Sequence, residues 1–131
     1  SDVIIVTRAL RNAEVPVQLL EVEDGVEALD FLYKRGKYSH SPTPDIVLLD
    51  LNLPRMSGHE VLASIKRDES LKLIPVIVLT TSEAASDITA VYKQYANSYI
   101  TKPVELSAFE AVIQEIVSYW GKLVTFAPKA K

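Results

Sequence analysis

The sequence of 131 residues contains no cysteine, which excludes disulfide bonds, thiol catalysis and thiolate metal sites. It also lacks any apolar run approaching the roughly 20 residues that a membrane-spanning helix needs. The first residues do not form the basic and then apolar segments of a signal peptide. The formal net charge is only −3, and lysines and arginines are scattered among acids, so we expect neither nucleic-acid nor membrane binding. The expected location is the cytoplasm.

The composition is that of one globular domain. Hydrophobic residues make up 48% of the sequence and charged residues 24%, values typical of a folded protein with a single core. We therefore expect residues 1–131 to form one domain. Residues 1–14 carry apolar side chains at helical spacing and predict a first helix. Four strand–helix units are predicted after it, with strands at 15–22, 45–51, 74–82 and 97–103 and helices at 24–36, 59–68, 83–96 and 105–124.

Strands that alternate with helices predict an α/β fold, in which a parallel sheet carries helices on both faces. The stretches 45–51 and 74–82 show no polar alternation, as expected for strands that are buried on both sides. In such sheets the functional groups lie at the carboxyl ends of the strands. The positions to examine are therefore 21–24, 50–52, 80–82 and 101–102.

Asp50 follows an apolar stretch in "DIVLLDLNLPRMSG". A carboxylate at a strand end is costly unless it is solvated, hydrogen-bonded or bound to a cation. One interpretation is a turn-forming or helix-capping aspartate. The other is a nucleophile that forms an aspartyl-phosphate, a reaction that needs Mg²⁺ and a fixed cation. Asp50 and the backbone carbonyl of Asn52 offer the oxygen ligands that Mg²⁺ prefers.

Two further strand ends carry side chains that suit a phosphoryl group. Thr80 ends one predicted strand, where its hydroxyl would reach a group on the neighbouring strand, although a β-branched residue is also ordinary strand filling. Lys102 ends the last predicted strand and is either the fixed cation or a snorkelling surface lysine. Because Lys102 precedes Pro103, this bond is a candidate cis peptide bond that would aim the lysine inward.

The stretches "DIVLLDLNLPRMSGHEVL", "IPVIVLTTS" and "NSYITKPV", together with "EDGVEAL", resemble the receiver domains of two-component response regulators. The resemblance covers nearly the whole chain. It implies a flavodoxin-like doubly wound sheet with the strand order 2-1-3-4-5, for which a receiver is a standard example. It also implies a role in phosphorelay signal transduction rather than enzyme activity, with a sensor histidine kinase as the partner.

The resemblance gives each matching residue a role. Asp50 corresponds to the phosphoacceptor and, with the carbonyl of Asn52, to a ligand of Mg²⁺. Thr80 corresponds to the switch hydroxyl that moves to the phosphoryl group, and Lys102 to the lysine that pairs with that group. Tyr99 corresponds to the aromatic residue that swings inward when Thr80 moves.

One part of the family pattern has no counterpart in the sequence. A receiver opens with an apolar strand that ends in adjacent acids, and residues 1–3 already match the start of the helix that follows it. By the family's strand order the absent strand is interior, and each buried backbone group left unpaired beside it costs about 1–3 kcal/mol. We therefore expect a chain derived from a longer protein. Its Mg²⁺ binding would be weakened or lost without the upstream acidic pair.

Glu23 and Asp24 are not expected to replace that pair. "GVEAL" follows them and opens the next helix, and their strand lies at the sheet edge, a whole strand away from Asp50. We expect a turn and a helix N-cap in which the Asp24 side chain accepts from backbone N–H groups. His59 lies beside a loop without a metal-spaced partner, so we expect a solvated surface residue.

The loop "YKRGKYSHSPTPD" and the ending "SYWGKLVTF" are similar to the small stand-alone regulators of bacterial phytochromes. Residues 119–131 would form a C-terminal extension. Tyr119, Trp120, Leu123 and Phe126 are too apolar for a free end, so they cover either the domain's own core or a second subunit. We expect a homodimer.

The leading hypothesis is a signalling module in which a histidine kinase, with a phytochrome as the candidate, phosphorylates Asp50. The module then shifts between two populations and changes its affinity for a partner. Two alternatives stay open: an interaction module that works without phosphorylation, and a phosphatase with an aspartyl nucleophile. Such phosphatases usually place a general acid two residues after the nucleophile, where Asn52 cannot protonate a leaving group.

Overall fold

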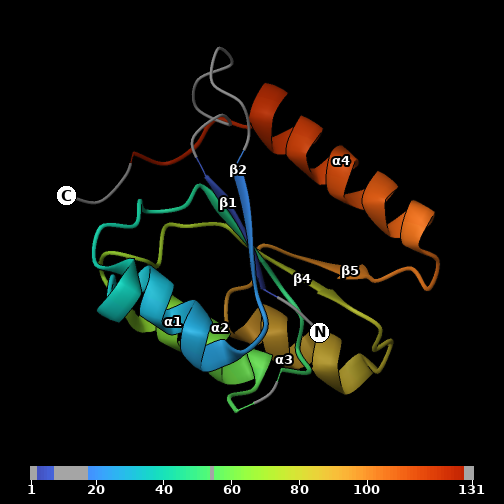
Figure 1. Cartoon of the computed structure of the whole chain (residues 1–131). Helices are drawn as coiled ribbons and strands as arrows, with labels where there is room; N and C mark the ends of the chain where they lie inside the picture. Colours follow the sequence, from blue (N-terminus) through green and yellow to red (C-terminus); the bar gives the residue numbers. More distant parts are fainter. Residues whose placement is uncertain (1–2, 8–17, 54, 129–131) are drawn as a thin grey trace.

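The computed structural model describes residues 3–7, 18–53 and 55–128. Its strands are β1 (Val3–Thr7), β2 (Gln18–Val22), β3 (Ile46–Leu49), β4 (Val76–Thr80) and β5 (Ser98–Thr101). Its helices are α1 (Gly25–Leu32), α2 (Gly58–Arg67), α3 (Ala85–Lys93) and α4 (Leu106–Lys122), with a short 3₁₀ helix at Gly36–Tyr38. Figure 1 shows the sheet between α1, α2 and α3 on one side and α4 on the other, which confirms the predicted α/β fold.

Strand β1 is the largest departure from the sequence prediction. Residues 3–7 form a strand and not part of a helix, so the helix predicted over 1–14 is wrong for this stretch, and the rest of that range lies outside the described residues. The five strands form one sheet in the order β2-β1-β3-β4-β5, so β1 fills the interior position that was expected to be empty. All five of its residues are β-branched, a composition that favours strands. Pairing there satisfies backbone groups of β2 and β3 that would otherwise be unpaired.

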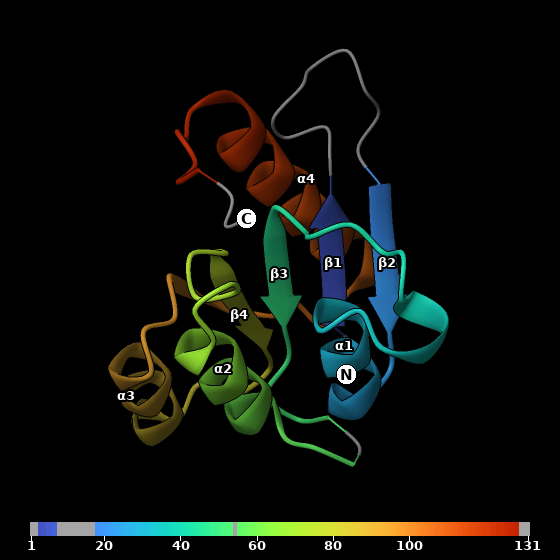
Figure 2. The same ribbon diagram turned by 90° about the vertical axis from the view of Figure 1, so that its left-hand side faces the viewer.

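The direction of β1 also differs from the direction that a fully parallel sheet would require. It runs antiparallel to both neighbours, with Val3 opposite Val22 on one side and Leu49 on the other (Figure 2). The pairs β3–β4 and β4–β5 are parallel. Antiparallel neighbours can be joined by a short connection, whereas parallel ones need a crossover of about a dozen or more residues, and ten residues separate β1 from β2. The predicted parallel sheet is therefore confined to β3, β4 and β5.

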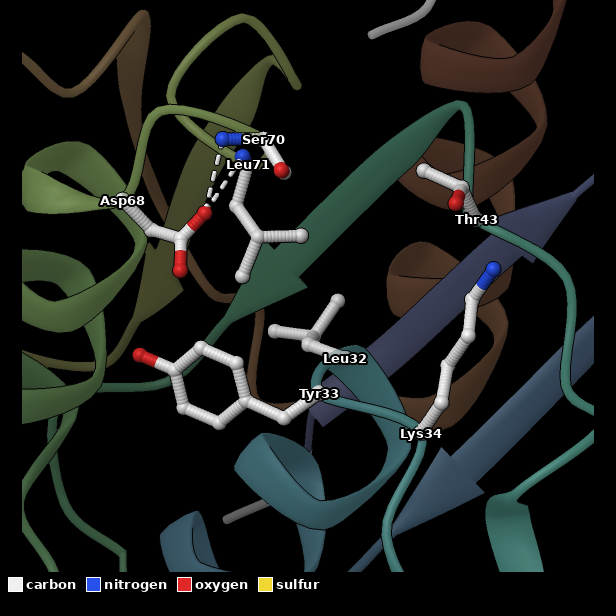
Figure 3. A pocket seen from close by; sticks show the side chains of 7 residues that line it. All are labelled: Leu32, Tyr33, Lys34, Thr43, Asp68, Ser70 and Leu71. Carbon is white, nitrogen blue, oxygen red and sulfur yellow. Dashed lines mark hydrogen bonds between the residues drawn. The ribbon is translucent and has the colours of Figure 1, made fainter. Parts of the chain in front are cut away.

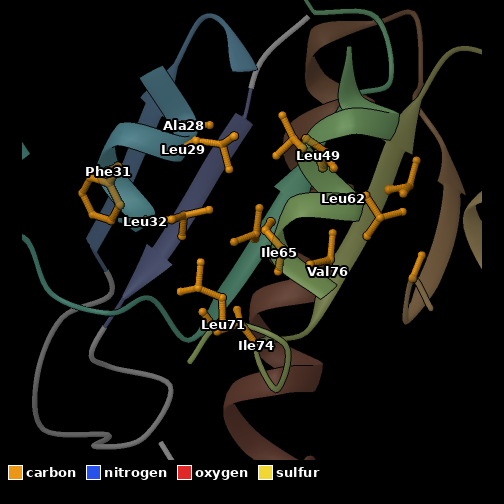
Figure 4. Close-up of a cluster of buried hydrophobic side chains, with 14 of the residues drawn as sticks. Ala28, Leu29, Phe31, Leu32, Leu49, Leu62, Ile65, Leu71, Ile74 and Val76 are labelled. Carbon is orange, nitrogen blue, oxygen red and sulfur yellow. The ribbon is translucent and has the colours of Figure 1, made fainter. Parts of the chain in front are cut away.

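Two hydrophobic cores lie on the two faces of the sheet. Alternate residues of a strand point to opposite faces, so Val47 and Leu49 join the core under α1, α2 and α3, while Ile46 and Leu48 join the core under α4. All four side chains are buried, as predicted for a strand covered on both sides. Figure 4 shows the first core, where side chains of α1 and α2 meet those of β3 and β4.

The apolar residues of the C-terminal extension divide between two environments. Trp120 and Phe126 pack against the core under α4, with their ring centroids 5.8 Å apart. Tyr119 and Leu123 are instead 54% and 76% exposed. Two of the four predicted side chains thus cover the domain's own core, and the other two face solvent. Within the described ranges, neither α4 nor another helix is long and apolar enough to cross a bilayer.

Candidate functional site

Asp50 lies at the carboxyl end of β3 and is only 5% exposed. Its Oδ1 accepts a hydrogen bond at 3.0 Å from Oγ1 of Thr80, the last residue of β4. The same oxygen accepts the backbone N–H of Asn52 at 3.0 Å. Lys102 follows β5, and its Nζ lies 3.7 Å from Oδ2 of Asp50. The structure thus brings together the predicted carboxylate, hydroxyl and ammonium groups from the ends of three adjacent strands.

The surroundings of Asp50 favour its charged form. Burial acts to raise its pKa, and the hydrogen bonds that it accepts act in the opposite direction, first the one from the Asn52 N–H and also the one from Thr80. The net result is a pKa for Asp50 below the usual value of 3.8. At neutral pH the group is therefore a carboxylate, which is the form that a nucleophile requires.

Lys102 is held by its backbone and by an aromatic ring. Its N–H donates to the carbonyl of Thr80 at 2.7 Å, next to the β4–β5 pairing. Its Nζ lies 5.1 Å from the ring centroid of Phe109 in α4, a distance at which the ring face attracts a cation. The described residues contain no cis peptide bond, so the predicted cis bond before Pro103 is wrong. A trans bond suffices, because the long side chain reaches Asp50 from the strand end.

Tyr99 connects the end of β4 to the rest of the domain. Its half-buried ring packs against the core under α1, α2 and α3, and its hydroxyl donates to the carbonyl of Ser82 at 2.8 Å. The Ser82 hydroxyl donates to Oδ2 of Asp87 at 2.6 Å, in the first turn of α3. The His59 side chain is 32% exposed, and its Nε2 lies 3.5 Å from Oδ1 of Asp87, an acidic neighbour that the sequence did not predict. The segment after Thr80 is therefore tied to β5, α3 and α2.

Sequence reasoning did not single out Arg55, which lies in the loop between β3 and α2. Its Nε and Nη2 donate to Oδ2 of Asp24 at 3.0 and 2.7 Å. The other carboxylate oxygen of Asp24 accepts the N–H of Glu27 at 2.7 Å, which confirms the predicted N-cap of α1. Arg55 and Asp24 are 31 positions apart. No local pattern in the sequence could therefore have revealed the pair.

The described residues do not by themselves complete a Mg²⁺ site. The Asp50 carboxylate and the Asn52 carbonyl are oxygen ligands of the predicted kind. However, no group of three or more Asp, Glu, His or Cys side chains that could hold a metal ion occurs within residues 3–7, 18–53 and 55–128. Asp24 does not fill the gap, because its two oxygens are engaged by the Glu27 N–H and by Arg55.

A small cavity of about 290 Å³ lies near the start of β3, where α1 and α2 end (Figure 3). None of the predicted site residues lines it, so the candidate site remains the group around Asp50 at the carboxyl end of β3. The cavity is lined by Leu32, Tyr33, Lys34, Thr43, Asp68, Ser70 and Leu71.

The fold and the three converging side chains define a receiver-type α/β domain. The sequence profile of the response regulator receiver domain matches residues 3–114. The chain therefore belongs to this family.

Within this family, the chain is similar to several regulators of known sequence or structure. Response regulator Rcp1 of Synechocystis sp. is 42% identical over 125 residues, which are 95% of this chain and 85% of Rcp1. The structure of the Mn²⁺-bound form of Rcp1 matches with a TM-score of 0.76 at 45% identity, over 82% of this chain and 77% of that one. The phosphorylated cyanobacterial phytochrome response regulator RcpA matches with a TM-score of 0.78 at 44% identity, over 82% and 76%. The chain is thus similar to phytochrome response regulators, as its loop and C-terminal residues predicted.

Proposed function

We propose that residues 1–131 act as a single receiver domain that accepts a phosphoryl group on Asp50 from a sensor histidine kinase. The observation that carries the proposal is the convergence of Thr80 Oγ1 and Lys102 Nζ on the two oxygens of one buried carboxylate. The similarity to RcpA, whose structure is that of a phosphorylated phytochrome response regulator, supports both the modification and a phytochrome as the kinase.

In the proposed step, a carboxylate oxygen of Asp50 attacks the phosphorus of a phosphohistidine. The O–P bond forms as the N–P bond breaks, and the imidazole leaves with the electron pair of that bond. Oδ1 is held by hydrogen bonds from Thr80 and Asn52, and Oδ2 lies beside the Lys102 ammonium, so the carboxylate is oriented before the attack. The Thr80 hydroxyl and the Lys102 ammonium would then stabilise the negative oxygens of the phosphoryl group.

Divalent metal binding is proposed to be weak in this chain. When bound, Mg²⁺ neutralises charge that develops on the phosphoryl oxygens. The chain's own contribution would be the Asp50 carboxylate and the Asn52 carbonyl. Support for divalent-metal binding comes from the similarity to the Mn²⁺-bound form of Rcp1.

Phosphorylation is proposed to act on the segment that follows Thr80. A phosphoryl group on Asp50 would take the Thr80 hydroxyl as its hydrogen-bond donor and displace the end of β4. The carbonyl of Ser82 is bonded to the Tyr99 hydroxyl, and the Ser82 side chain to Asp87 of α3. A displacement would therefore reach the surface of α3 and β5 and change which partner binds there.

The matching experiment is labelling of the chain with acetyl phosphate and Mg²⁺, or with a histidine kinase, followed by intact-mass measurement. We expect one added phosphoryl group, at low occupancy because the described residues supply only part of a metal site, and none in Asp50→Asn. Asp30→Asn, on the outer surface of α1, is the matched control and should label like the wild type. A wild-type chain that no donor labels would sink the proposal and favour an interaction module independent of phosphorylation. Steady turnover of phosphate esters would instead favour a phosphatase.

We also propose a homodimer that forms through the exposed side of α4. Tyr119 and Leu123 are exposed there, and Tyr119 lines a cavity of about 440 Å³ together with Ile100, Ile116 and Trp120. Exposed apolar side chains that gather on one surface favour an interaction site. Sedimentation should show a concentration-dependent dimer for the wild type and a monomer when Tyr119 and Leu123 are both replaced by serine. A wild type that stays monomeric at every concentration contradicts the dimer.

A further inference from the structure

Arg55 has an uncommon backbone conformation close to the candidate site. Its φ is +63°, in the left-handed region that few residues other than glycine adopt. It lies three residues after Asn52, in the loop that leaves the strand of Asp50. Such a conformation persists only where surrounding contacts hold it. Two hydrogen bonds from its guanidinium to Oδ2 of Asp24, at 3.0 and 2.7 Å, are contacts of that kind.

Asp24 is itself held in place by its role at the start of α1, so it can fix the position of Arg55. Its Oδ1 caps α1 by accepting the N–H of Glu27, which leaves Oδ2 for the guanidinium. The Glu27 N–H lowers the pKa of Asp24, burial opposes this, and Arg55 lowers the pKa further, so the carboxylate stays charged at neutral pH. The side chain of Asp24 is 15% exposed and that of Arg55 is 60% exposed. The ion pair thus fastens an exposed loop to a largely buried helix end.

Close backbone packing joins the same two segments beside the ion pair. A Cβ added to Gly25 would lie 2.6 Å from the carbonyl oxygen of Met56. At the end of the same loop, a Cβ added to Gly58 would lie 2.2 Å from the carbonyl oxygen of Asp50. The loop is therefore pressed between the start of α1 and the end of β3. Its position and that of Asp50 are coupled.

We infer that the Arg55–Asp24 ion pair positions the loop after β3 so that the backbone of Asn52 faces the Asp50 carboxylate. The Asn52 N–H donates to Oδ1 of Asp50 at 3.0 Å, and this bond depends on the path of the loop. Without the ion pair the loop is freed, that bond weakens, and phosphoryl transfer to Asp50 slows. The kinetic part of this inference rests on the proposed function, whereas the structural part does not.

Three variants isolate the ion pair. Asp24→Asn removes the charge but keeps an N-cap, because asparagine caps helices as well as aspartate does. Arg55→Gln removes the other charge, and the double variant closes a mutant cycle. Arg35→Gln is the matched control, because Arg35 Nε contacts Asp30 Oδ1 at 3.1 Å in an exposed ion pair outside the site.

The first measurement is the amide chemical shift of Asn52 in two-dimensional ¹H–¹⁵N spectra of the unphosphorylated chain. This signal should move in Asp24→Asn and Arg55→Gln, move equally in the double variant, and stay in place in Arg35→Gln. The second measurement is the rate of labelling by acetyl phosphate with Mg²⁺. It should fall about two- to fivefold in each single variant, the range that an exposed ion pair supports. The double variant should lose no more, because the two residues act as one unit.

An Asn52 signal that stays in place in both single variants, with unchanged labelling rates, would overturn the inference. Losses that add up in the double variant would overturn it too, because each residue would then act alone. Asp50→Asn, measured in parallel, separates this inference from the proposed function. If the wild-type chain is not labelled at all, the proposed function fails, and the Asn52 shift still decides whether the ion pair positions the loop.

Discussion

The two halves of the sheet differ in packing and in the groups that they carry. Strands β3 and β4 are buried along their whole length and pair in parallel. In contrast, most of the edge strand β2 is exposed: Leu19 is 51% exposed, and only Val22, at 2%, is buried. Asp50 and Thr80 come from the ends of the buried strands, whereas Asp24 comes from the end of β2. Asp50 and Thr80 therefore lie on strands that are buried along their whole length, and Asp24 lies beside a more exposed strand.

The largest expected effect is a cavity in the buried half. Leu48 in β3 is 1% exposed, and Leu48→Ala should lower the free energy of unfolding by about 2–5 kcal/mol because the hole cannot collapse fully. Leu19→Ala in β2 is the matched variant and should change it by no more than about 0.5 kcal/mol. Urea unfolding followed by circular dichroism measures both. Equal losses would show that β2 is packed as tightly as β3.

The next effect concerns the backbone beside the phosphoacceptor. A Cβ at Gly58 would lie 2.2 Å from the carbonyl oxygen of Asp50 and 2.6 Å from the Cα of Leu51. Gly58→Ala should therefore cost about 1–3 kcal/mol of stability and slow the labelling of Asp50. Gly36→Ala is the control: its φ is +57° but nothing lies within 4 Å of the added Cβ. It should cost about 1 kcal/mol from the backbone alone and leave labelling unchanged, and slower labelling there would contradict the local explanation.

The buried half is also the one that the sequence predicted best. The predicted strands at 45–51 and 74–82 contain the apolar runs of β3 and β4, and Asp50 and Thr80 lie at the ends of these runs. The signal is local, because an apolar run marks the strand and the first polar residue marks its end. Combined with the rule for the carboxyl ends of strands, it predicted that these side chains and Lys102 would meet.

The other half resisted prediction because its decisive contacts are not local. Residues 3–7 fit helical spacing, but the position between β2 and β3 offers backbone partners, and pairing there overrides the local period. The contact of Arg55 with Asp24 and that of His59 with Asp87 join residues from different elements. No spacing rule links such positions, so only the folded chain reveals them.

Low pH should reduce the stability of the fold through one carboxylate in each half of the sheet. The pKa values of Asp50 and Asp24 both lie below 3.8. A group whose pKa is lower in the folded than in the unfolded state stabilises the fold above the unfolded pKa and loses this effect as pH falls through the folded pKa. Wild-type stability should therefore fall as the pH drops below about 4. It should fall less steeply in Asp50→Asn and Asp24→Asn, which urea midpoints from neutral to acidic pH will show. If the stability of Asp24→Asn falls with pH as steeply as that of the wild type, the Asp24 carboxylate contributes nothing to the pH dependence of stability.

The smallest expected effect is at Tyr99, where one hydrogen bond links β5 to the segment after Thr80. Tyr99→Phe keeps the packed ring but removes the 2.8 Å bond to the Ser82 carbonyl, at a cost of about 0.5–1.5 kcal/mol. Ser82→Ala is the matched variant, because it keeps that carbonyl and removes the side-chain bond to Asp87.

If Tyr99 couples the site to α3, phosphorylation should shift the amide signals of α3 less in Tyr99→Phe than in the wild type, while the loss of stability stays within about 0.5–1.5 kcal/mol. Equal shifts in both proteins would remove this hydrogen bond from the coupling. The ties of Ser82 and His59 to Asp87 would then be left as the described route from the site to α3. A reduced shift in Tyr99→Phe with a normal one in Ser82→Ala would instead place the coupling on β5, the partly exposed strand beside β4.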